Sequence, residues 1–79
     1  MKIADEYKAD YEGYAEPLAL LEKAFQAAGV NVEFELCLSG GFDEKKVVIY
    51  LDGNFKKRVS IEGDNPPTAI QDVARAVTW

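Results

Sequence analysis

A chain of 79 residues forms one domain, because chains divide into several domains only when they are much longer. Apolar residues make up 48% of the sequence and charged residues 29%, which is typical of a folded protein and excludes a disordered chain. The net charge of −5 opposes non-specific binding to the phosphate backbone of nucleic acids.

The sequence contains no histidine and one cysteine, Cys37. Histidine is the commonest general base and transition-metal ligand, so we expect no catalytic centre, metal or cofactor. Without a histidine to activate it, Cys37 is interpreted as structural, and a lone thiol suits a reducing compartment. Apolar runs are too short for a membrane span, and the first residues are acidic where a signal peptide is apolar. We therefore expect a cytoplasmic protein without membrane contacts.

Apolar and aromatic residues recur at helical spacing through the N-terminal third of the chain. The stripe consists of Ile3, Tyr7, Tyr11, Tyr14, Leu18, Leu21, Phe25 and Ala28. Because Pro17 interrupts it, two arrangements remain open. One is a single kinked helix, and the other, which we favour, is a helical arm near 3–13 followed by a helix near 16–28. Gly29 is then expected to be the left-handed C-cap, with Val30 closing its hydrophobic contact.

Segment 30–38 alternates apolar and mostly polar residues, as expected of a strand with one buried face. A connection over 39–44 leads to two further strands, 46–51 and 55–62, joined as a hairpin by the turn at 52–54.

The loop length of this hairpin follows from which residues of its two strands must share the core face. A two-residue loop would bring Lys56 and Arg58 to the core face, so we predict a three-residue loop with Asn54 left-handed and Leu51 paired with Phe55. The core face of the hairpin then carries Val47, Ile49, Leu51, Phe55, Lys57, Val59 and Ile61. Lys57 is tolerable there only if its ammonium group reaches past the sheet edge.

A second helix begins near 64–68, with Asn65 or Asp64 as its N-cap and two prolines in its first turn. Its apolar face consists of Ile70, Val73, Ala74 and Val77. The order α-β-β-β-α predicts an α+β fold in which a three-stranded antiparallel meander carries two helices on one face. We expect a single domain over 1–79, with an arm at 1–14 and a core at 15–79.

This element order resembles the double-stranded-RNA-binding domain over about residues 16–78. That family holds phosphates with lysines at the start of its second helix, where the stretch 64–69 has no basic residue. The resemblance implies RNA binding, and the only basic run that could provide it is Lys56, Lys57 and Arg58. The alternative is a charged edge strand without a function.

The sheet face away from the helices is the first candidate interface. It should present Glu33, Glu35, Cys37, Val48, Tyr50, Lys56, Arg58 and Ser60. An apolar centre with a charged rim fits a protein-binding patch, with Tyr50, Val48, Glu33 and Glu35 as the contact residues. The alternative is an open face stabilised by cross-strand pairs such as Tyr50 with Lys56.

The tyrosines of the arm are the second candidate interface. They stand among acidic residues, and Tyr7, Tyr11, Asp10 and Glu12 are the contact residues that we expect there. The tyrosines either bind a partner or seat the arm on the core. The acidic side chains either mimic nucleic-acid phosphates toward a basic partner or only solvate the arm. Trp79 is either folded over the core or exposed as a contact.

In size, acidity and compact α+β build, the chain resembles the small accessory proteins of bacteriophages and mobile elements, including the anti-CRISPR class. The resemblance implies a non-enzymatic inhibitor in the host cytoplasm that binds a host protein or nucleoprotein complex and occludes its working surface. The other hypotheses are the RNA-binding domain and a homo-oligomer, such as a homodimer, paired through strand edges or arms.

Overall fold

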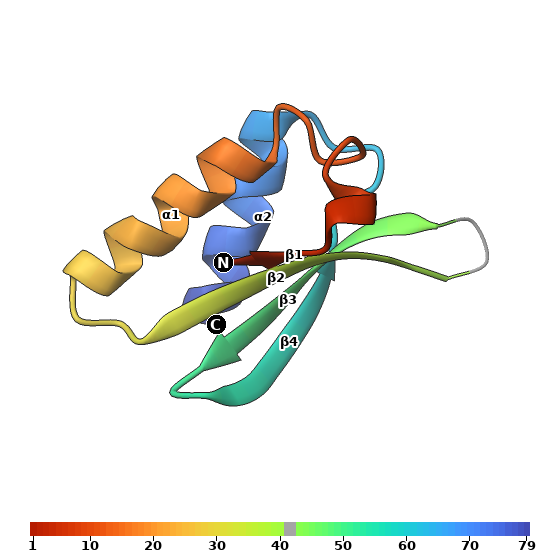
Figure 1. Ribbon diagram of the computed structural model, residues 1–79. Coiled ribbons are helices and arrows are strands. Elements are labelled where there is room, and N and C mark those ends of the chain that lie inside the picture. Colours follow the sequence, from red (N-terminus) through yellow and green to blue (C-terminus); the bar gives the residue numbers. More distant parts are fainter. Residues whose placement is uncertain (41–42) are drawn as a thin grey trace.

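The computed structural model describes residues 1–40 and 43–79, which form a four-stranded sheet with two helices on one face (Figure 1). The elements are β1 (Lys2–Ile3), the short 3₁₀ helix η1 (Asp5–Tyr7), α1 (Ala15–Ala27), β2 (Val32–Ser39), β3 (Glu44–Leu51), β4 (Asn54–Ser60) and α2 (Pro66–Thr78). The expected connection at 39–44 includes positions 41 and 42, which lie outside the described residues. Neither described helix is both long and apolar enough to cross a bilayer.

The strands lie in the order β1-β2-β3-β4. The antiparallel pairs β2–β3 and β3–β4 confirm the predicted meander, and the α+β class is confirmed with them. The prediction of a purely antiparallel three-stranded sheet is wrong, because β1 adds a fourth strand parallel to β2, with Ile3 opposite Leu36. A strand of two residues is too short to show an alternation in the sequence.

The N-terminal segment is not the predicted helical arm. After η1 it continues through tight turns, in which the amide of Asp10 donates to the carbonyl of Tyr7 and that of Tyr14 to Tyr11. Gly13 then takes a φ of +85°, which ends this run before α1 begins. A separate helix with Pro17 in its first turn is confirmed, and a single kinked helix is excluded.

Both predicted helix boundaries with capping residues are present. Gly29 has a φ of +88°, and the amide of Val30 donates to the carbonyl of Phe25 at 2.9 Å, which completes the expected C-terminal motif of α1. Asn65, rather than Asp64, is the N-cap of α2, since its side chain accepts the amide of Thr68 at 2.9 Å.

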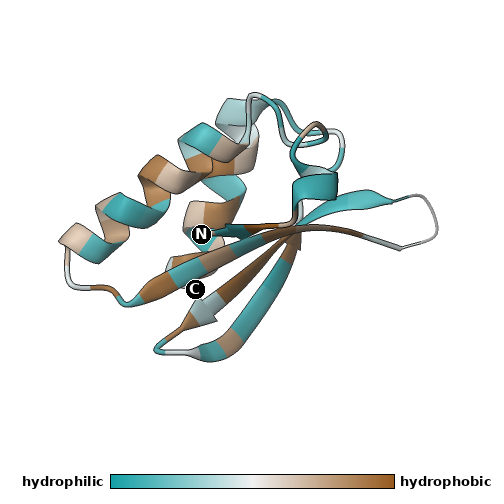
Figure 2. Cartoon of the chain, viewed as in Figure 1, coloured by the Kyte–Doolittle hydropathy of each residue, from teal (hydrophilic) through white to brown (hydrophobic). Residues whose placement is uncertain are grey.

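The core lies between the sheet and the helices, and apolar and polar residues alternate along the first part of β2 (Figure 2). Its buried residues are Tyr11, Leu18, Val32, Phe34, Leu36, Val47, Ile49, Ile61, Ala69, Val73, Ala76 and Val77. The inward parity predicted for 30–38 is therefore confirmed. Trp79 is not folded over this core, because 84% of its surface is exposed.

The hairpin between β3 and β4 differs from the prediction in its loop. Asp52 and Gly53 have φ values of +53° and +81°, and Leu51 pairs with Asn54, so the loop has two residues. Asn54 is not the left-handed residue. Asp-Gly is a favoured pair for such a turn, because it accepts positive φ at both positions.

A bulge in β4 corrects the parity that a two-residue loop would otherwise give. Tyr50 faces Phe55 and Ile49 faces Lys57, so Lys56 is an extra residue without a partner in β3. Val59 then faces Val47, as predicted. The core position predicted for Phe55 is wrong, because 60% of its surface is exposed.

Candidate functional site

The sheet face opposite the helices, which we call the open face, is formed by side chains from all four strands. Moving from β1 to β4, it carries Lys2, Glu33, Glu35, Cys37, Lys46, Val48, Tyr50, Phe55, Arg58 and Ser60. Glu33 pairs with Tyr50, and Glu35 pairs with Val48. The structure therefore brings together the four open-face residues that the sequence singled out.

Tyr50 lies at the centre of this face and has a partner on each side. Its hydroxyl donates to Oε1 of Glu35 at 3.1 Å. This hydrogen bond, followed by burial and the negative charge of Glu35, raises the pKa of Tyr50. Its ring meets that of Phe55 edge to face, with centroids 6.5 Å apart and planes at 76°. The predicted pair of Tyr50 with Lys56 is wrong, because the two-residue loop places Phe55 opposite Tyr50.

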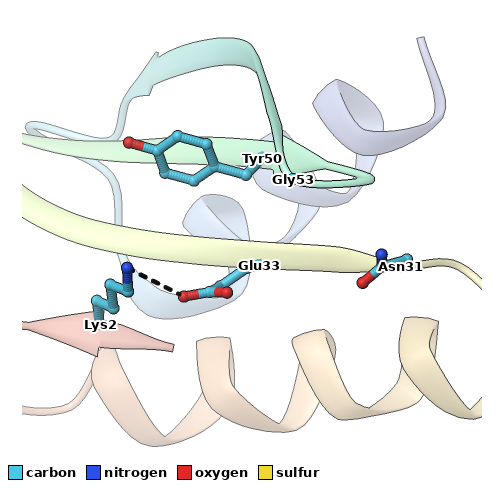
Figure 3. A pocket seen from close by; sticks show the side chains of 5 residues that line it. All are labelled: Lys2, Asn31, Glu33, Tyr50 and Gly53. Carbon is cyan, nitrogen blue, oxygen red and sulfur yellow. Dashed lines mark ion pairs between the residues drawn. The ribbon is translucent and has the colours of Figure 1, made fainter.

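A shallow cavity of about 450 Å³ lies beside this aromatic pair and is lined by Lys2, Asn31, Glu33, Tyr50 and Gly53 (Figure 3). The ammonium group of Lys2 points toward Glu33, with 3.9 Å between Nζ and Oε1. Both side chains are largely exposed, so this ion pair is weak and easily exchanged for another cation. The cavity therefore offers an aromatic ring and a carboxylate to a positively charged side chain.

Val48 and Cys37 form the floor of the open face and expose little surface. Val48 is 7% exposed, so it supports its neighbours and offers little area for contact. Burial, and then the negative charge of Glu35, raises the pKa of the Cys37 thiol. The thiol therefore stays protonated at neutral pH and is a poor nucleophile.

The basic run does not form a single patch. Lys56 was expected on the open face, but the two-residue loop places it on the helix side, where its Nζ donates to the carbonyl of Val77. Lys57 also lies on the helix side, opposite Ile49, and Arg58 lies on the open face, opposite Val48. A phosphate backbone approaching one face would meet only part of this run.

The arm residues lie apart from the open face. Tyr11 is fully buried, and its hydroxyl lies 2.7 Å from the carbonyl oxygen of Cys37 and 2.9 Å from that of Lys46. The expected partner contact at Tyr11 is therefore wrong, and the interpretation of this tyrosine as core is confirmed. Tyr7 is half-buried against the same core, and Asp10 and Glu12 are exposed on the segment that covers it. The two expected interfaces are thus on different sides of the sheet (Figure 1).

Sequence reasoning missed Phe55, Lys2 and Asn31 as parts of this site. The Asp-Gly pair at 52–53 was the signal for Phe55, since a two-residue loop places Phe55 directly opposite Tyr50. Nothing in the sequence indicates that Lys2 belongs to the sheet. Among the described residues, no three acidic or cysteine side chains gather into a group that could hold a metal ion.

Comparison of the chain with protein-family models, with curated proteins and with solved structures gives no match.

Proposed function

We propose that this protein is a non-enzymatic protein-binding module whose binding surface is the open face. The observation that carries the proposal is the Tyr50–Phe55 aromatic pair, which lies beside Glu33 and Glu35 on a sheet face that neither described helix covers. Exposed aromatic rings next to polar groups are the usual centre of a protein interface.

The chemistry of this surface favours a basic partner. A guanidinium group from the partner could stack on the ring of Tyr50 and pair with Glu33, displacing Lys2 from its weak ion pair. The hydroxyl of Tyr50 fixes the carboxylate of Glu35 at 3.1 Å, which prepares the second acceptor before binding. We therefore infer that the partner presents an arginine or lysine to the open face.

The overall charge adds long-range attraction to such a partner. The net charge is −5, and Asp10 and Glu12 are among the exposed carboxylates outside the open face. Charges of this kind accelerate association with a basic surface without contacting it, and salt weakens the effect. The resulting activity is occlusion: the module covers a working surface of a host protein or nucleoprotein complex, as an anti-CRISPR-type inhibitor does.

The experiment compares partner capture by the tagged chain and by variants, using lysate of the source cells and mass spectrometry. We expect Tyr50→Ala and Glu33→Lys to lose proteins that the unmodified chain retains. Glu12→Lys is the matched control, because it makes the same charge change on the exposed N-terminal segment, which lies on the other side of the sheet. Circular dichroism of each variant establishes that it is folded.

The purified partner then permits a direct measurement. Its addition to the ¹⁵N-labelled chain should shift the amide signals of β2 and β3 more than those of α1. Capture that Tyr50→Ala and Glu33→Lys leave unchanged, or shifts confined to the helices, would remove the open face from the proposal.

A further inference from the structure

The two edges of the sheet differ in how far other parts of the chain cover them. On one side, β1 covers part of β2, and two side chains of α1 bind its remaining edge: Glu22 accepts the amide of Phe34, and Gln26 donates to the carbonyl of Val32. On the other side, β4 is the last strand of the sheet (Figure 1). An uncovered edge is a template for another strand.

The backbone groups of β4 that point outward can be assigned from its register. The amide of Ile61 donates inward to the carbonyl of Lys45 at 3.0 Å. Inward and outward groups alternate along an antiparallel strand, so the amides of Arg58 and Ser60 point away from β3. The bulge at Lys56 lies before these two residues and leaves their spacing regular.

A groove of about 310 Å³ runs beside this part of β4, between the strand and α2. Its lining includes Arg58, Val59, Ser60, Arg75, Ala76 and Trp79. The exposed indole of Trp79 and the half-buried side chain of Val59 provide apolar surface, and the buried Ala76 lies at the base of the groove. The β4 edge and this groove together have both elements of strand addition, which are outward-pointing backbone donors and a pocket for alternate side chains.

The charge of the groove indicates which kind of strand would bind beside β4. Lys57, Arg58 and Arg75 line it together with one acidic residue, Asp72, which lies 3.9 Å from Arg75. The groove is therefore basic on a chain whose net charge is −5. A second copy of β4 would bring its own Lys57 and Arg58 against these cations, so self-pairing is opposed by repulsion.

We propose that the β4 edge binds an extended acidic segment of another protein, which adds a fifth strand to the sheet. Alternate side chains of this segment enter the groove beside Val59 and Ala76, and its carboxylates meet Arg58 and Arg75. This surface shares Arg58 and Ser60 with the margin of the open face but contains neither the Tyr50–Phe55 pair nor Glu33 and Glu35, and the inference does not depend on the function proposed above.

The test measures fluorescence anisotropy of a labelled peptide of alternating Glu and Val, with a Lys-Val peptide as the charge control. We expect the unmodified chain to bind the Glu-Val peptide, and added salt to weaken the complex. Ser60→Pro should weaken binding at least about tenfold, because proline removes an outward amide and is tolerated on an edge strand. Ser60→Ala, which keeps that amide, should bind as the unmodified chain does.

Charge is tested separately with Arg75→Glu, which should also weaken binding about tenfold. Lys23→Glu, on the exposed side of α1, is the matched control and should have little effect. If Ser60→Pro does not fold, a Glu-Val peptide N-methylated along its pairing edge replaces it and should fail to bind.

Three results would overturn the inference. The first is equal binding of the Glu-Val and Lys-Val peptides, or of neither. The second is undiminished binding by Ser60→Pro or by the N-methylated peptide. The third is a dimer, seen by light scattering, that Ser60→Pro dissociates, since the edge would then belong to a second copy of this chain.

Discussion

The carboxylate of Glu22 on α1 accepts the backbone amide of Phe34 on β2, with 2.7 Å between Oε2 and the nitrogen. Its other oxygen, Oε1, lies 2.9 Å from the N-terminal ammonium group. β1 pairs with β2 at Glu35 and Leu36 and does not extend to Phe34. A helix side chain therefore satisfies a buried strand amide that no strand covers.

Glu22→Ala should lower the free energy of unfolding by about 2–4 kcal/mol, because it leaves the Phe34 amide and a nearby ammonium group without their partner. Glu22→Gln should cost less, since its side-chain oxygen still accepts the amide. Urea denaturation monitored by circular dichroism measures both. Glu16→Gln, on the exposed side of the same helix, is the control and should stay within about 0.5 kcal/mol of the unmodified chain. Equal losses for Glu22→Ala and Glu16→Gln would contradict the assigned role.

The hydroxyl of Tyr11 is a second buried polar group with long-range partners. Tyr11→Phe removes its contacts with the carbonyls of Cys37 and Lys46 while keeping the ring. We expect a loss of about 1–2 kcal/mol in urea denaturation. Tyr7→Phe makes the same chemical change at a half-buried ring and should change stability by less than about 0.5 kcal/mol. If the two variants are equally stable, the contacts of the Tyr11 hydroxyl contribute nothing net.

Alkaline pH tests the same residue through its ionisation. Burial, and then the negative charge of Cys37, raises the pKa of Tyr11 well above its ordinary value of 10.0. Above pH 10 the unfolded chain releases this proton and the folded chain keeps it, so stability falls as pH rises. The fall contributed by one proton is at most about 1.4 kcal/mol per pH unit. Thermal unfolding between pH 9 and 11 should therefore depend less on pH in Tyr11→Phe than in the unmodified chain.

Local signals in the sequence were sufficient for most of the fold. Gly29 and Val30 end α1 as predicted, because the capping motif depends only on neighbouring backbone groups. The alternation of apolar and polar residues around Phe34 was sufficient to predict which face of β2 is buried. What the sequence does not show are contacts between distant residues: the two-residue β1, and the carboxylate of Glu22 against Phe34.

The candidate site was predicted in part for the same reason. Glu33, Glu35, Val48 and Tyr50 share a face because strand alternation requires it. Lys56 was misplaced because the loop has two residues and not three. The bulge at Lys56 then restores the even parity predicted for Val47 and Val59. Tyr11 is buried in the core, as its place in the helical stripe predicted, although its segment is not an α-helix.

Asp64, just before the N-cap of α2, and Asp72, in the middle of α2, form an unfavourable carboxylate pair. Oδ2 of Asp64 is buried without a hydrogen-bond partner in the described part of the chain. A hydrogen bond to the Asp72 carboxyl, which requires a shared proton, raises the pKa of Asp64 above 3.8, and burial adds to the effect. Because the folded state holds this proton more tightly, the pair becomes less destabilising as pH falls through the raised pKa.

Asp64→Asn should therefore raise the melting temperature at pH 7, since the amide can donate to Asp72 without a proton from solvent. The gain should shrink near pH 3, where Asp64 of the unmodified chain is protonated. Scanning calorimetry at both pH values measures the difference, with Asp10→Asn on the exposed arm as the control. A gain that is the same at pH 3 and pH 7 would show that repulsion is not its cause.

Gly53 is required by the hairpin that positions Tyr50 against Phe55. Its φ of +81° is unfavourable for any residue with a β-carbon, and the space around it is open, so a substitution meets strain without a clash. Gly53→Ala should cost about 1–2 kcal/mol in urea denaturation. Asp52→Asn is the control, because asparagine tolerates the φ of +53° at that position and should be nearly neutral. If the loop were instead the three-residue turn with Asn54 left-handed, Asn54→Ala would be the costly change and Gly53→Ala the mild one.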